Sequence, residues 1–467
     1  MYIIGLDIGT TGVRAIAFDQ QGKSAYSFYQ PLALSFPKPG FIEQDPIEIL
    51  NKTGFVLKAI IKQVGHKSVV GMGITNQRET TIVWDEAGKP VYPAISWQCR
   101  RTADRCTDFS FFSEKVKQKT GLPLDPYFSA TKLEWILNQV SSSQNLKFGT
   151  VDTWILWHLT GQHLTDVSNA SRTLLFNIDT LDYDDELLSL FSIPRQLLPT
   201  VVPSQGRIAE TKNFEFRLPV FSVIGDQQAA LFAQCGDNTE WIKNTYGTGI
   251  FLMSCCGKTR PQHVKNLITT IAWKTDDVMY AVEGSMFAGG STLQWLKEDL
   301  GFIETVEESD KLSSQLTDTA GVFFIPALAG LGAPYWNPNA KGAWYGMTRS
   351  TSKAHLVRSV LESLAYQSKA VIEALPQASF KALKVDGGVT KNNFLMQFQA
   401  DILNLEVHRS SQLEATAFGA AALAALYSGF WTSSTLNREI ETIFKPKPID
   451  HGYASWSSYM KQYEMAL

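Results

Sequence analysis

A β-favouring run, a turn of glycine and threonine, and a second β-favouring run occur twice in this chain, and this pattern restricts its fold more than any other feature. The first copy reads YIIGLDIG, TTG and VRAIAFD, and the second is KNTYGTGIFLMS, which begins at Lys243. Short runs of β-branched and aromatic residues between such turns are typical of antiparallel strands. The two copies share a pattern and not residue identity. They predict two α/β halves of similar construction that face each other.

Helical segments alternate with these strands. The apolar spacing from Pro46 to Val64 fits an amphipathic helix, and VVGMGITN after it is predicted to be a buried strand of the same sheet. Farther along, HLVRSVLESLAYQSKAVIEAL and ATAFGAAALAAL are predicted helices, and KVDGGVTKNNFLMQFQADIL is a predicted strand, turn and helix. The fold class that follows is α/β, with sheets flanked by helices.

The length of the chain indicates two domains. With 467 residues it exceeds the ~250–300 residues at which single cores stop growing. We place the boundary near Cys235, where the helix after GDQQ is predicted to end and the polar segment GDNTE follows. The predicted domains are residues 1–235 and 236–467, and a cleft between them follows naturally.

Composition excludes several classes of partner. A net charge of -3 gives no broad attraction to nucleic acid or to an anionic membrane. The apolar stretch FGAAALAALYSGFW is shorter than the ~20 residues that cross a bilayer, so we expect no membrane insertion. The five cysteines are odd in number and form no CxxC pair, and the N-terminus lacks a basic run. We therefore expect reduced thiols, no signal peptide and a cytoplasmic location.

The segment LDIGTTGVR is the strongest candidate for binding phosphate. Asp7 would end a strand, and the turn after it offers backbone N–H groups, hydroxyls and a fixed positive charge to phosphate oxygens. The donors are Thr10, Thr11, Gly12 and Arg14. Asp7 is the candidate Mg²⁺ ligand, directly or through water. An ordinary glycine-threonine hairpin explains the segment equally well when it is taken alone.

Two further glycine-rich turns lie in the second half. In YGTG, the hydroxyl of Thr248 could reach a phosphate chain from the other side of the cleft. In VDGGVTKNN, Gly388 leaves room against a purine or an α-phosphate, and a helix is predicted to begin near Asn392. Alone, the latter is more simply a tight turn between strand and helix.

The segment GDQQ follows the apolar run VFSVI, so Asp226 is predicted to end a strand at the mouth of the cleft. A carboxylate there could accept a hydroxyl proton, because phosphoryl transfer needs positioning, charge neutralisation and a base for the attacking hydroxyl. The alternative is that Asp226 caps the following helix. The two roles are compatible.

A candidate substrate site lies in the segment GITNQRETTIVWD. Arg78 and Glu79 place a donor beside an acceptor, and such a pair can grip adjacent hydroxyls of a polyol. Trp97, Tyr127 and Phe128 would add an apolar wall. Taken singly, each aromatic residue is more often part of a core. The sequence contains no HExxH, no Cys/His cluster of zinc spacing and no GxxxxGK[ST] loop, which argues against a transition-metal site and a P-loop fold.

Taken together, the motifs resemble those of glycerol kinases in the FGGY family of carbohydrate kinases. In chain order they are LDIGTTGVR, ITNQRETTIVWD, SWQCRRTAD, LDPYFSATK, FGTVDTWILW, NASRTLLFNI, GDQQAALF, NTYGTG, GLGAPYW and DGGVTKNNFLMQFQADIL. The resemblance implies two actin-like (ribonuclease H-like) domains, each a mixed five-stranded sheet flanked by helices, with an interdomain cleft. It also implies transfer of phosphate from ATP to glycerol with Mg²⁺.

The resemblance assigns roles to individual positions. For glycerol it implies Arg78, Glu79, Trp97, Tyr127, Asp226, Gln227 and Phe251, with Asp226 as the general base. For ATP it implies Thr10, Thr11, Gly12, Arg14, Thr248, Gly290, Gln294, Gly388 and Asn392. Asp7 is the implied Mg²⁺ partner.

The sequence departs from the family pattern in three places. Gly12 stands where many members carry serine, so backbone alone replaces a hydroxyl contact to phosphate. The segment TKNFEFR stands where members inhibited by a sugar bisphosphate have a glycine-rich loop with arginine. No histidine lies between Thr165 and Val223, where some members are activated by phosphorylation. Neither form of regulation is therefore expected.

Two alternatives stay open. A related kinase of another small polyol or a ketose would share the fold and the phosphate turns, although NQRET and DPYF argue against it. A nucleotide-driven clamp or filament protein would lack a substrate cluster. The assembly we consider is a homodimer or a homotetramer, between which the sequence does not decide.

Overall fold

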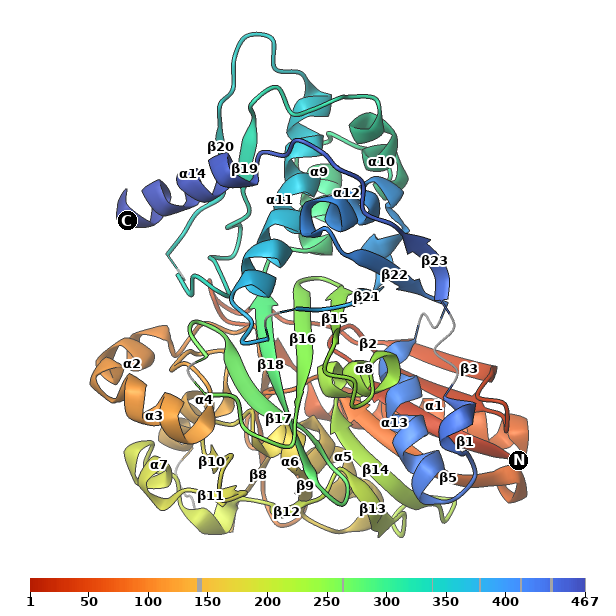
Figure 1. The fold of residues 1–467 in the computed structure, drawn as a ribbon. Helices are drawn as coiled ribbons and strands as arrows, with labels where there is room; N and C mark the ends of the chain where they lie inside the picture. Colours follow the sequence, from red (N-terminus) through yellow and green to blue (C-terminus); the bar gives the residue numbers. More distant parts are fainter. Residues whose placement is uncertain are drawn as a thin grey trace.

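The computed structural model describes residues 1–140, 145–262, 264–337, 339–377, 379–411, 414–436 and 440–466. Two mixed β-sheets organise these residues, one at the lower right and one through the middle of Figure 1. The first sheet runs in the order β13 (Gln205–Glu210), β14 (Pro219–Gly225), β5 (Val69–Asn76), β1 (Tyr2–Ile8), β2 (Gly12–Phe18), β3 (Ser24–Pro31). The predicted N-terminal meander is confirmed, because β1, β2 and β3 pair antiparallel in sequence order.

The second sheet repeats the hairpin beside parallel strands. Its order is β17 (Ile268–Lys274), β18 (Val278–Met286), β16 (Ile250–Gly257), β15 (Trp241–Tyr246), β21 (Ala382–Asp386), β22 (Glu406–Ser410), β23 (Ile440–Phe444). The α/β class with two mixed sheets is confirmed. Within the described residues the sheets hold six and seven strands instead of five, because β13, β17 and β23 each pair antiparallel along an edge.

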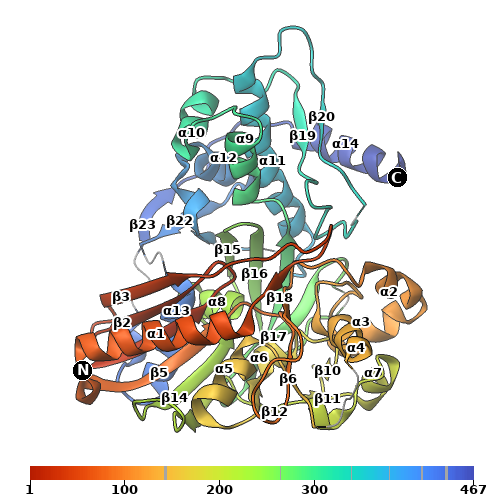
Figure 2. The ribbon, with the colours of Figure 1, turned by 180° about the vertical axis from the view of Figure 1, so that it is seen from behind.

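Local signals define the first helix, α1 (Pro46–Val64), as predicted. The Asp45 side chain accepts a hydrogen bond from the Ile47 N–H, Pro46 occupies the first turn, and Gly65 ends the helix at φ 80°. Its apolar face joins α5 (Val151–Thr160) in covering one face of the first sheet, and Figure 2 shows α1 lying across the strands. This side of the sheet holds one hydrophobic core.

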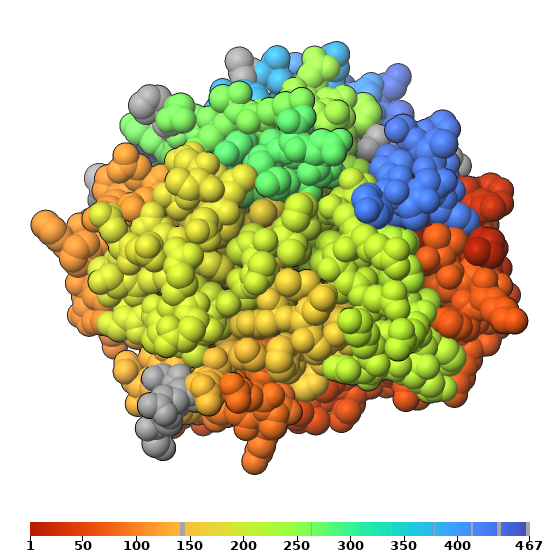
Figure 3. All heavy atoms as spheres, turned by 90° about the horizontal axis from the view of Figure 1, so that it is seen from below, coloured from red at the N-terminus to blue at the C-terminus, as the bar shows by residue number. Residues whose placement is uncertain are grey.

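Two helices separate the sheets. Helix α8 (Asp226–Gln234) follows β14, and α13 (Ala415–Tyr427) packs against α8 and across β1, β5 and β14. The approach is close, because a Cβ on Gly5 would lie 2.3 Å from the Ala417 carbonyl oxygen. A buried apolar cluster joins β14, α8 and α13 to β16, β17 and β18. From below, the C-terminal segment of α13 therefore lies beside N-terminal residues (Figure 3).

The remaining helices form two groups. Those above the second sheet share its main core: α9 (Gly290–Glu298), α10 (Val306–Ser314), α11 (Lys353–Glu373), α12 (Asn393–Leu403) and α14 (Tyr453–Ala466). Those beside the first sheet share a core with β17 and β18: α3 (Ser113–Thr120), α4 (Ser129–Gln139), α6 (Val167–Ala170) and α7 (Asp185–Leu190). Helix α2 (Ala103–Asp108) precedes α3 in the chain.

Five two-stranded sheets complete the described fold. They pair β4 (Glu43–Gln44) with β7 (Ala94–Ile95), β6 (Ile82–Trp84) with β8 (Lys147–Gly149), β9 (Leu164–Asp166) with β12 (Thr200–Val202), β10 (Phe176–Asn177) with β11 (Asp182–Tyr183), and β19 (Phe323–Ile325) with β20 (Ala343–Tyr345). In the described part of the chain, no helix combines the length and apolarity that crossing a bilayer requires. The five cysteines form no disulfide.

The predicted boundary near Cys235 coincides with the end of α8 at Gln234. The chain later returns from the second sheet to the first. Helix α13 belongs to the second half of the sequence but packs against the first sheet. The division at residue 235 stays a prediction.

Candidate active site

Three parallel strands bring the candidate polar residues to one edge of the first sheet. Strands β1, β5 and β14 are neighbours in parallel register, with Ile8 opposite Asn76 and Asn76 opposite Gly225. The carboxyl ends of such strands meet at the same edge, where open α/β sheets bind ligands. Asp7 at the end of β1, the segment after β5 and Asp226 after β14 are thereby placed side by side.

Arg78 lies at the centre of a buried ion network. Its Nη1 and Nη2 donate to the Glu283 carboxylate at 2.6 and 3.0 Å, and its Nε lies 3.2 Å from Asp226 Oδ1. Arg172 binds Glu283 at 3.2 Å and Glu79 at 2.6 Å. Glu283 is 0% exposed. Burial opposes its ionisation, but Arg172 and Arg78 outweigh this and lower the pKa of Glu283 to about 2.

Glu79 is predicted from the sequence as a polyol ligand and lies in the same network. Its backbone adopts φ 63°, a conformation that non-glycine residues rarely take and that often marks functional sites. Burial raises the pKa of the carboxyl, and the neighbouring Arg172 and Arg78 oppose this. Arg172 and Glu283 were missed by sequence reasoning, although a carboxylate inside the apolar strand MYAVEGSM is itself a signal.

Asp226 is the most exposed member of the network, with a side chain that is 24% exposed. Its Oδ1 accepts a hydrogen bond from the Gln227 N–H at 2.7 Å, and its Oδ2 accepts one from the Gln227 side chain at 3.3 Å. The interpretation of Asp226 as a helix cap is wrong by one residue. Gly225 is the N-cap of α8 and Asp226 is the first helical residue.

Lys243 reaches this centre from the second sheet and was also missed. Its ammonium donates to the Gln227 side-chain oxygen and, at 3.4 Å, to the Phe251 carbonyl. Burial lowers the pKa of Lys243 to about 8, while Asp386 and Asp226 act in the opposite direction. A lysine in a predicted strand, three residues before the YGTG turn, is the sequence signal that could have found it.

Aromatic side chains form a wall beside the network. The Trp97 ring lies 5.6 Å from Tyr127 and 5.9 Å from Phe251, measured between ring centroids. All three line a cavity of about 160 Å³, together with Thr248 and Gly249. Arg78 and Asp226 do not line the cavity themselves, but the Arg78 Nη2 donates to the Tyr127 hydroxyl at 3.4 Å. The small volume suits a small substrate.

Phe128 is the exception among the predicted aromatic residues. It is fully buried in the core of the neighbouring helices, behind Tyr127. The core interpretation is confirmed for this residue.

The predicted nucleotide residues of the second half come together around one cavity of about 400 Å³. Its lining includes Thr248, Gly290, Gln294, Gly388 and Asn392. Thr248 also lines the aromatic cavity, so the two spaces meet at the YGTG turn. The fit is close, since a Cβ on Gly290 would lie 2.8 Å from the Gly247 carbonyl oxygen. A helix begins near Asn392 as predicted, and the Asn392 side chain caps it by accepting from the Leu395 N–H.

The phosphate turn of the first half lies between β1 and β2 and lines neither cavity in the described chain. Thr10 is joined to the aromatic wall, because the Trp97 indole N–H donates to its hydroxyl at 2.9 Å. Arg14 forms an ion pair with Glu414 at 2.6 Å, at the start of α13. The turn is thus held from both sides, by Trp97 and by α13.

Asp7 is the candidate residue for a divalent cation, and its surroundings test this prediction. Burial raises the pKa of its carboxyl to about 7, opposed by a hydrogen bond from Thr416 and assisted by the charge of Asp226. A cation would relieve both effects. Among the described residues no group of three or more His, Cys, Asp or Glu could hold a metal ion. One carboxylate fits Mg²⁺, which keeps several waters and takes further ligands from substrate phosphates.

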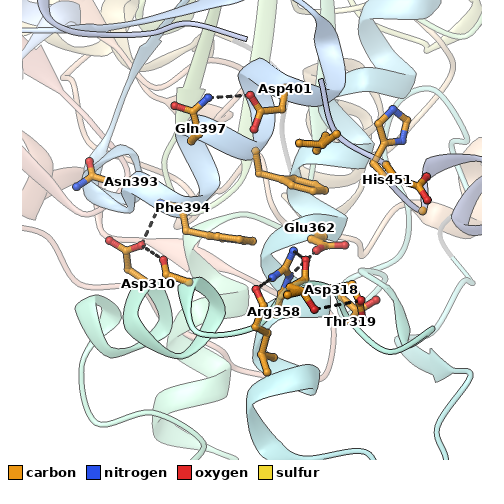
Figure 4. Close-up of a pocket in the computed structure, with 17 residues that line it drawn as sticks. Asp310, Asp318, Thr319, Arg358, Glu362, Asn393, Phe394, Gln397, Asp401 and His451 are labelled. Carbon is orange, nitrogen blue, oxygen red and sulfur yellow. Dashed lines mark hydrogen bonds and ion pairs between the residues drawn. The ribbon is translucent and has the colours of Figure 1, made fainter. Parts of the chain in front are cut away.

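A wider cavity of about 560 Å³ lies between α10, α11 and α12 (Figure 4). Its lining carries five carboxylates, those of Asp310, Asp318, Glu362, Asp401 and Asp450. The Arg358 guanidinium is occupied by Glu362 and by backbone carbonyls, among them that of Thr317 at 2.9 Å. This negative lining repels phosphate, so the cavity is not the nucleotide site.

The chain is similar over nearly its full length to several known proteins. The chain is 44% identical to a glycerol kinase of Pseudothermotoga lettingae, with 98% of this chain and 97% of that relative covered, and 48% identical to one of Burkholderia pseudomallei, with 92% and 90% covered. A glycerol kinase of Plasmodium falciparum solved with ADP has a TM-score of 0.90 and 34% identity, covering 100% of this chain and 98% of that one.

A more distant likeness concerns the fold alone. A ligand-bound xylulose kinase of Lactobacillus acidophilus has a TM-score of 0.88 at 21% identity, covering 100% of this chain and 97% of that one. The N-terminal domain model of the FGGY family of carbohydrate kinases matches residues 2–233, and the C-terminal domain model matches residues 242–428. The chain therefore belongs to the FGGY family of carbohydrate kinases.

Proposed function

We propose that this protein transfers the γ-phosphoryl group of ATP to glycerol, giving sn-glycerol 3-phosphate and ADP. The observation that carries the proposal is the contact between Arg78 and Asp226 beside a small aromatic cavity. A fixed donor and an open carboxylate at such a cavity can orient and deprotonate the hydroxyl of a small polyol. The full-length relatives named as glycerol kinases support the same substrate.

In the proposed reaction, Arg78, Glu79 and Gln227 orient the hydroxyls of glycerol against the aromatic wall. Asp226 accepts the proton of the attacking hydroxyl as its oxygen forms a bond to the γ-phosphorus. The bond from that phosphorus to the β,γ-bridging oxygen breaks, and its electrons leave with ADP. These steps are mainly positioning and charge stabilisation, as phosphoryl transfer requires.

The nucleotide is proposed to lie across the cleft. The residues around the 400 Å³ cavity would hold its adenosine part, and the two glycine-threonine turns would donate to its phosphates. Mg²⁺ held near Asp7 supplies neutralisation of the phosphate charge when it is bound. Closure over the site would exclude water, which otherwise competes with glycerol for the γ-phosphate. We place this reaction in the cytoplasm, where ATP and Mg²⁺ are supplied.

A coupled assay of ADP release over a panel of acceptors tests the proposal. We expect kcat/KM for glycerol to exceed that for erythritol, xylulose and other ketoses. A preference for one of these by orders of magnitude would assign the chain to another substrate of the family. ATP turnover that is independent of any acceptor would instead indicate a nucleotide-driven clamp.

A further inference from the structure

An aromatic residue that no motif assigns packs against the phosphate turn of the first half. Tyr29 lies on β3, directly opposite Arg14 on β2, and its ring leans diagonally over Gly12. A Cβ on Gly12 would meet the Tyr29 hydroxyl and Cε2 at 2.3 Å and Cζ at 2.4 Å. The ring therefore fills the space of the side chain that position 12 lacks. A hydroxyl group is present at that place, supplied by a different strand.

Two contacts fix the ring in this place. The hydroxyl donates to the Thr11 carbonyl at 3.0 Å, and the Arg14 guanidinium lies 5.0 Å from the ring centroid. Tyr29 is nevertheless 46% exposed. The ring is thus held by specific contacts while about half of its surface stays open to a ligand at this turn.

The surroundings of the hydroxyl indicate what that partner is. Asp7 and Arg14 are cross-strand neighbours, so they share one face of the sheet with Gly12 and Tyr29. Thr10 and Thr11 precede Gly12 in the turn that we assign to the phosphates. A ligand at this turn would meet the phenol beside the Arg14 guanidinium, whose Nη1 pairs with Glu414 at 2.6 Å. The other N–H groups of Arg14 and the phenol are a combination that suits an anionic oxygen.

We propose that Tyr29 is a nucleotide-binding residue whose hydroxyl donates to the phosphate chain of bound ATP, in place of a side chain at position 12. The phenolic proton goes to the neutral Thr11 carbonyl in this structure. An anionic phosphate oxygen is a stronger acceptor, because charge-assisted hydrogen bonds are roughly twice as strong as neutral ones. Rotation about the bond between Cζ and the hydroxyl oxygen redirects the proton. The proposal rests on the proposed function for its ligand.

The test is Tyr29→Phe, which keeps the ring over Gly12 and removes only the hydroxyl. We expect KM for ATP to rise about tenfold and KM for glycerol to stay unchanged, since hydrogen bonds to charged groups are worth about 1.5–3 kcal/mol. Tyr26→Phe on the same strand is the control. Its ring packs against Tyr2, away from the turn, and its loss of a hydroxyl should change neither constant.

A pair of variants tests whether the Tyr29 hydroxyl replaces a side-chain hydroxyl at position 12. Gly12→Ser alone must displace the ring and should weaken ATP binding, whereas Gly12→Ser combined with Tyr29→Ala restores a hydroxyl without the clash. The double variant should bind ATP more tightly than Tyr29→Ala alone. Equal affinity of these two variants, or an unchanged KM for ATP in Tyr29→Phe, would overturn the proposal.

Calorimetric titration with MgADP and with adenosine separates this proposal from the proposed function. Tyr29→Phe should weaken MgADP and leave adenosine unaffected, because adenosine has no phosphate. This comparison does not depend on the acceptor, so a parent protein that fails to phosphorylate glycerol would reject the proposed function while the titration still decides on Tyr29. Equal weakening of both ligands would show a structural effect and reject the phosphate contact.

Discussion

Arg78 and Asp226 form an ion pair whose two members differ in exposure: the guanidinium is 2% exposed and the carboxylate is 24% exposed, with 3.2 Å between Nε and Oδ1. The arginine cannot follow the carboxylate into solvent because Glu283 holds its other end at 2.6 Å. The carboxylate is thereby oriented by a group that is fixed elsewhere in the protein. This is the preorganisation that a base for proton transfer needs.

Asp226→Asn should separate binding from chemistry. The amide keeps the size of the carboxylate but cannot accept the hydroxyl proton, so we expect kcat to fall roughly 10²–10⁴-fold while KM for glycerol changes little. Steady-state kinetics with glycerol varied at saturating ATP measures both constants. Near-normal turnover would reject the role of general base.

Asp237→Asn serves as the control for this variant. Asp237 is exposed just beyond the end of α8, so the same chemical change occurs outside the network. Its kcat should match that of the parent.

Glu283→Gln should destabilise the protein. It removes the anion that two buried guanidinium groups share, and breaking a buried pair in this way costs about 3–5 kcal/mol. Urea denaturation should show a clearly lower midpoint, and kcat should fall because Arg78 loses its anchor. The matched change Glu210→Gln breaks surface pairs with Arg207 and Arg217 and should cost less than about 1 kcal/mol. Similar costs for the two variants would contradict the importance of the network.

Lys243→Met should affect glycerol binding in a pH-dependent way. The lysine holds the Gln227 side chain, and its pKa is lowered to about 8 by burial, so its positive charge is lost as the pH rises through 8. In the parent, KM for glycerol should rise between pH 7 and 9. The isosteric methionine variant should start with a KM about tenfold higher, as expected for a lost hydrogen bond to a charged group, and lack this rise. A rise of the same size in both proteins would exclude Lys243 as its source.

Local signals were sufficient for much of the fold. The bounds of α1 follow from Asp45, Pro46 and Gly65, all within the helix or next to it. The hairpins and the helix after Asn392 are equally local. Helix α13 was predicted as a helix, but its place against the first sheet depends on contacts with β1 and β5, hundreds of residues away.

The residues of the candidate site also fall into those that local sequence signals predicted and those that depend on long-range contacts. Short motifs were sufficient to predict Arg78, Glu79 and Asp226, because each of these residues follows a strand in a recognisable segment. Glu283 was not predicted as a site residue, because its partner Arg78 lies 205 residues earlier and no spacing rule connects the two. Tyr29 was missed for a different reason. Its ring leans from β3 over Gly12 on β2, so that the hydroxyl reaches the turn, and the strand register alone does not predict this.

His163→Gln should reduce the loss of stability in mild acid. The His163 Nε2 is 2.8 Å from the Phe148 carbonyl oxygen, and burial lowers its pKa to about 4 from an unfolded value of about 6.5. Between these values the unfolded state binds more protons, so the free energy of unfolding falls as the pH falls, by about 2 kcal/mol from this group. Glutamine keeps an N–H donor and does not titrate.

Urea denaturation at intervals from pH 7 to pH 4.5 measures this difference. The curve of stability against pH should be shallower for His163→Gln than for the parent in that window. Parallel curves would show that the acid sensitivity comes from other groups.

Gly54→Ala and Gly65→Ala should have opposite effects on stability, although both glycines belong to the region of α1. A Cβ on Gly54 meets nothing within 4 Å inside the helix, so alanine should stabilise by about 0.5–1 kcal/mol through helix propensity and a less flexible unfolded chain. Gly65 adopts φ 80° at the helix end, where alanine is strained by roughly 1–2 kcal/mol. Thermal unfolding should therefore shift upward for the first variant and downward for the second, and a shift of the same sign would contradict this account of the helix.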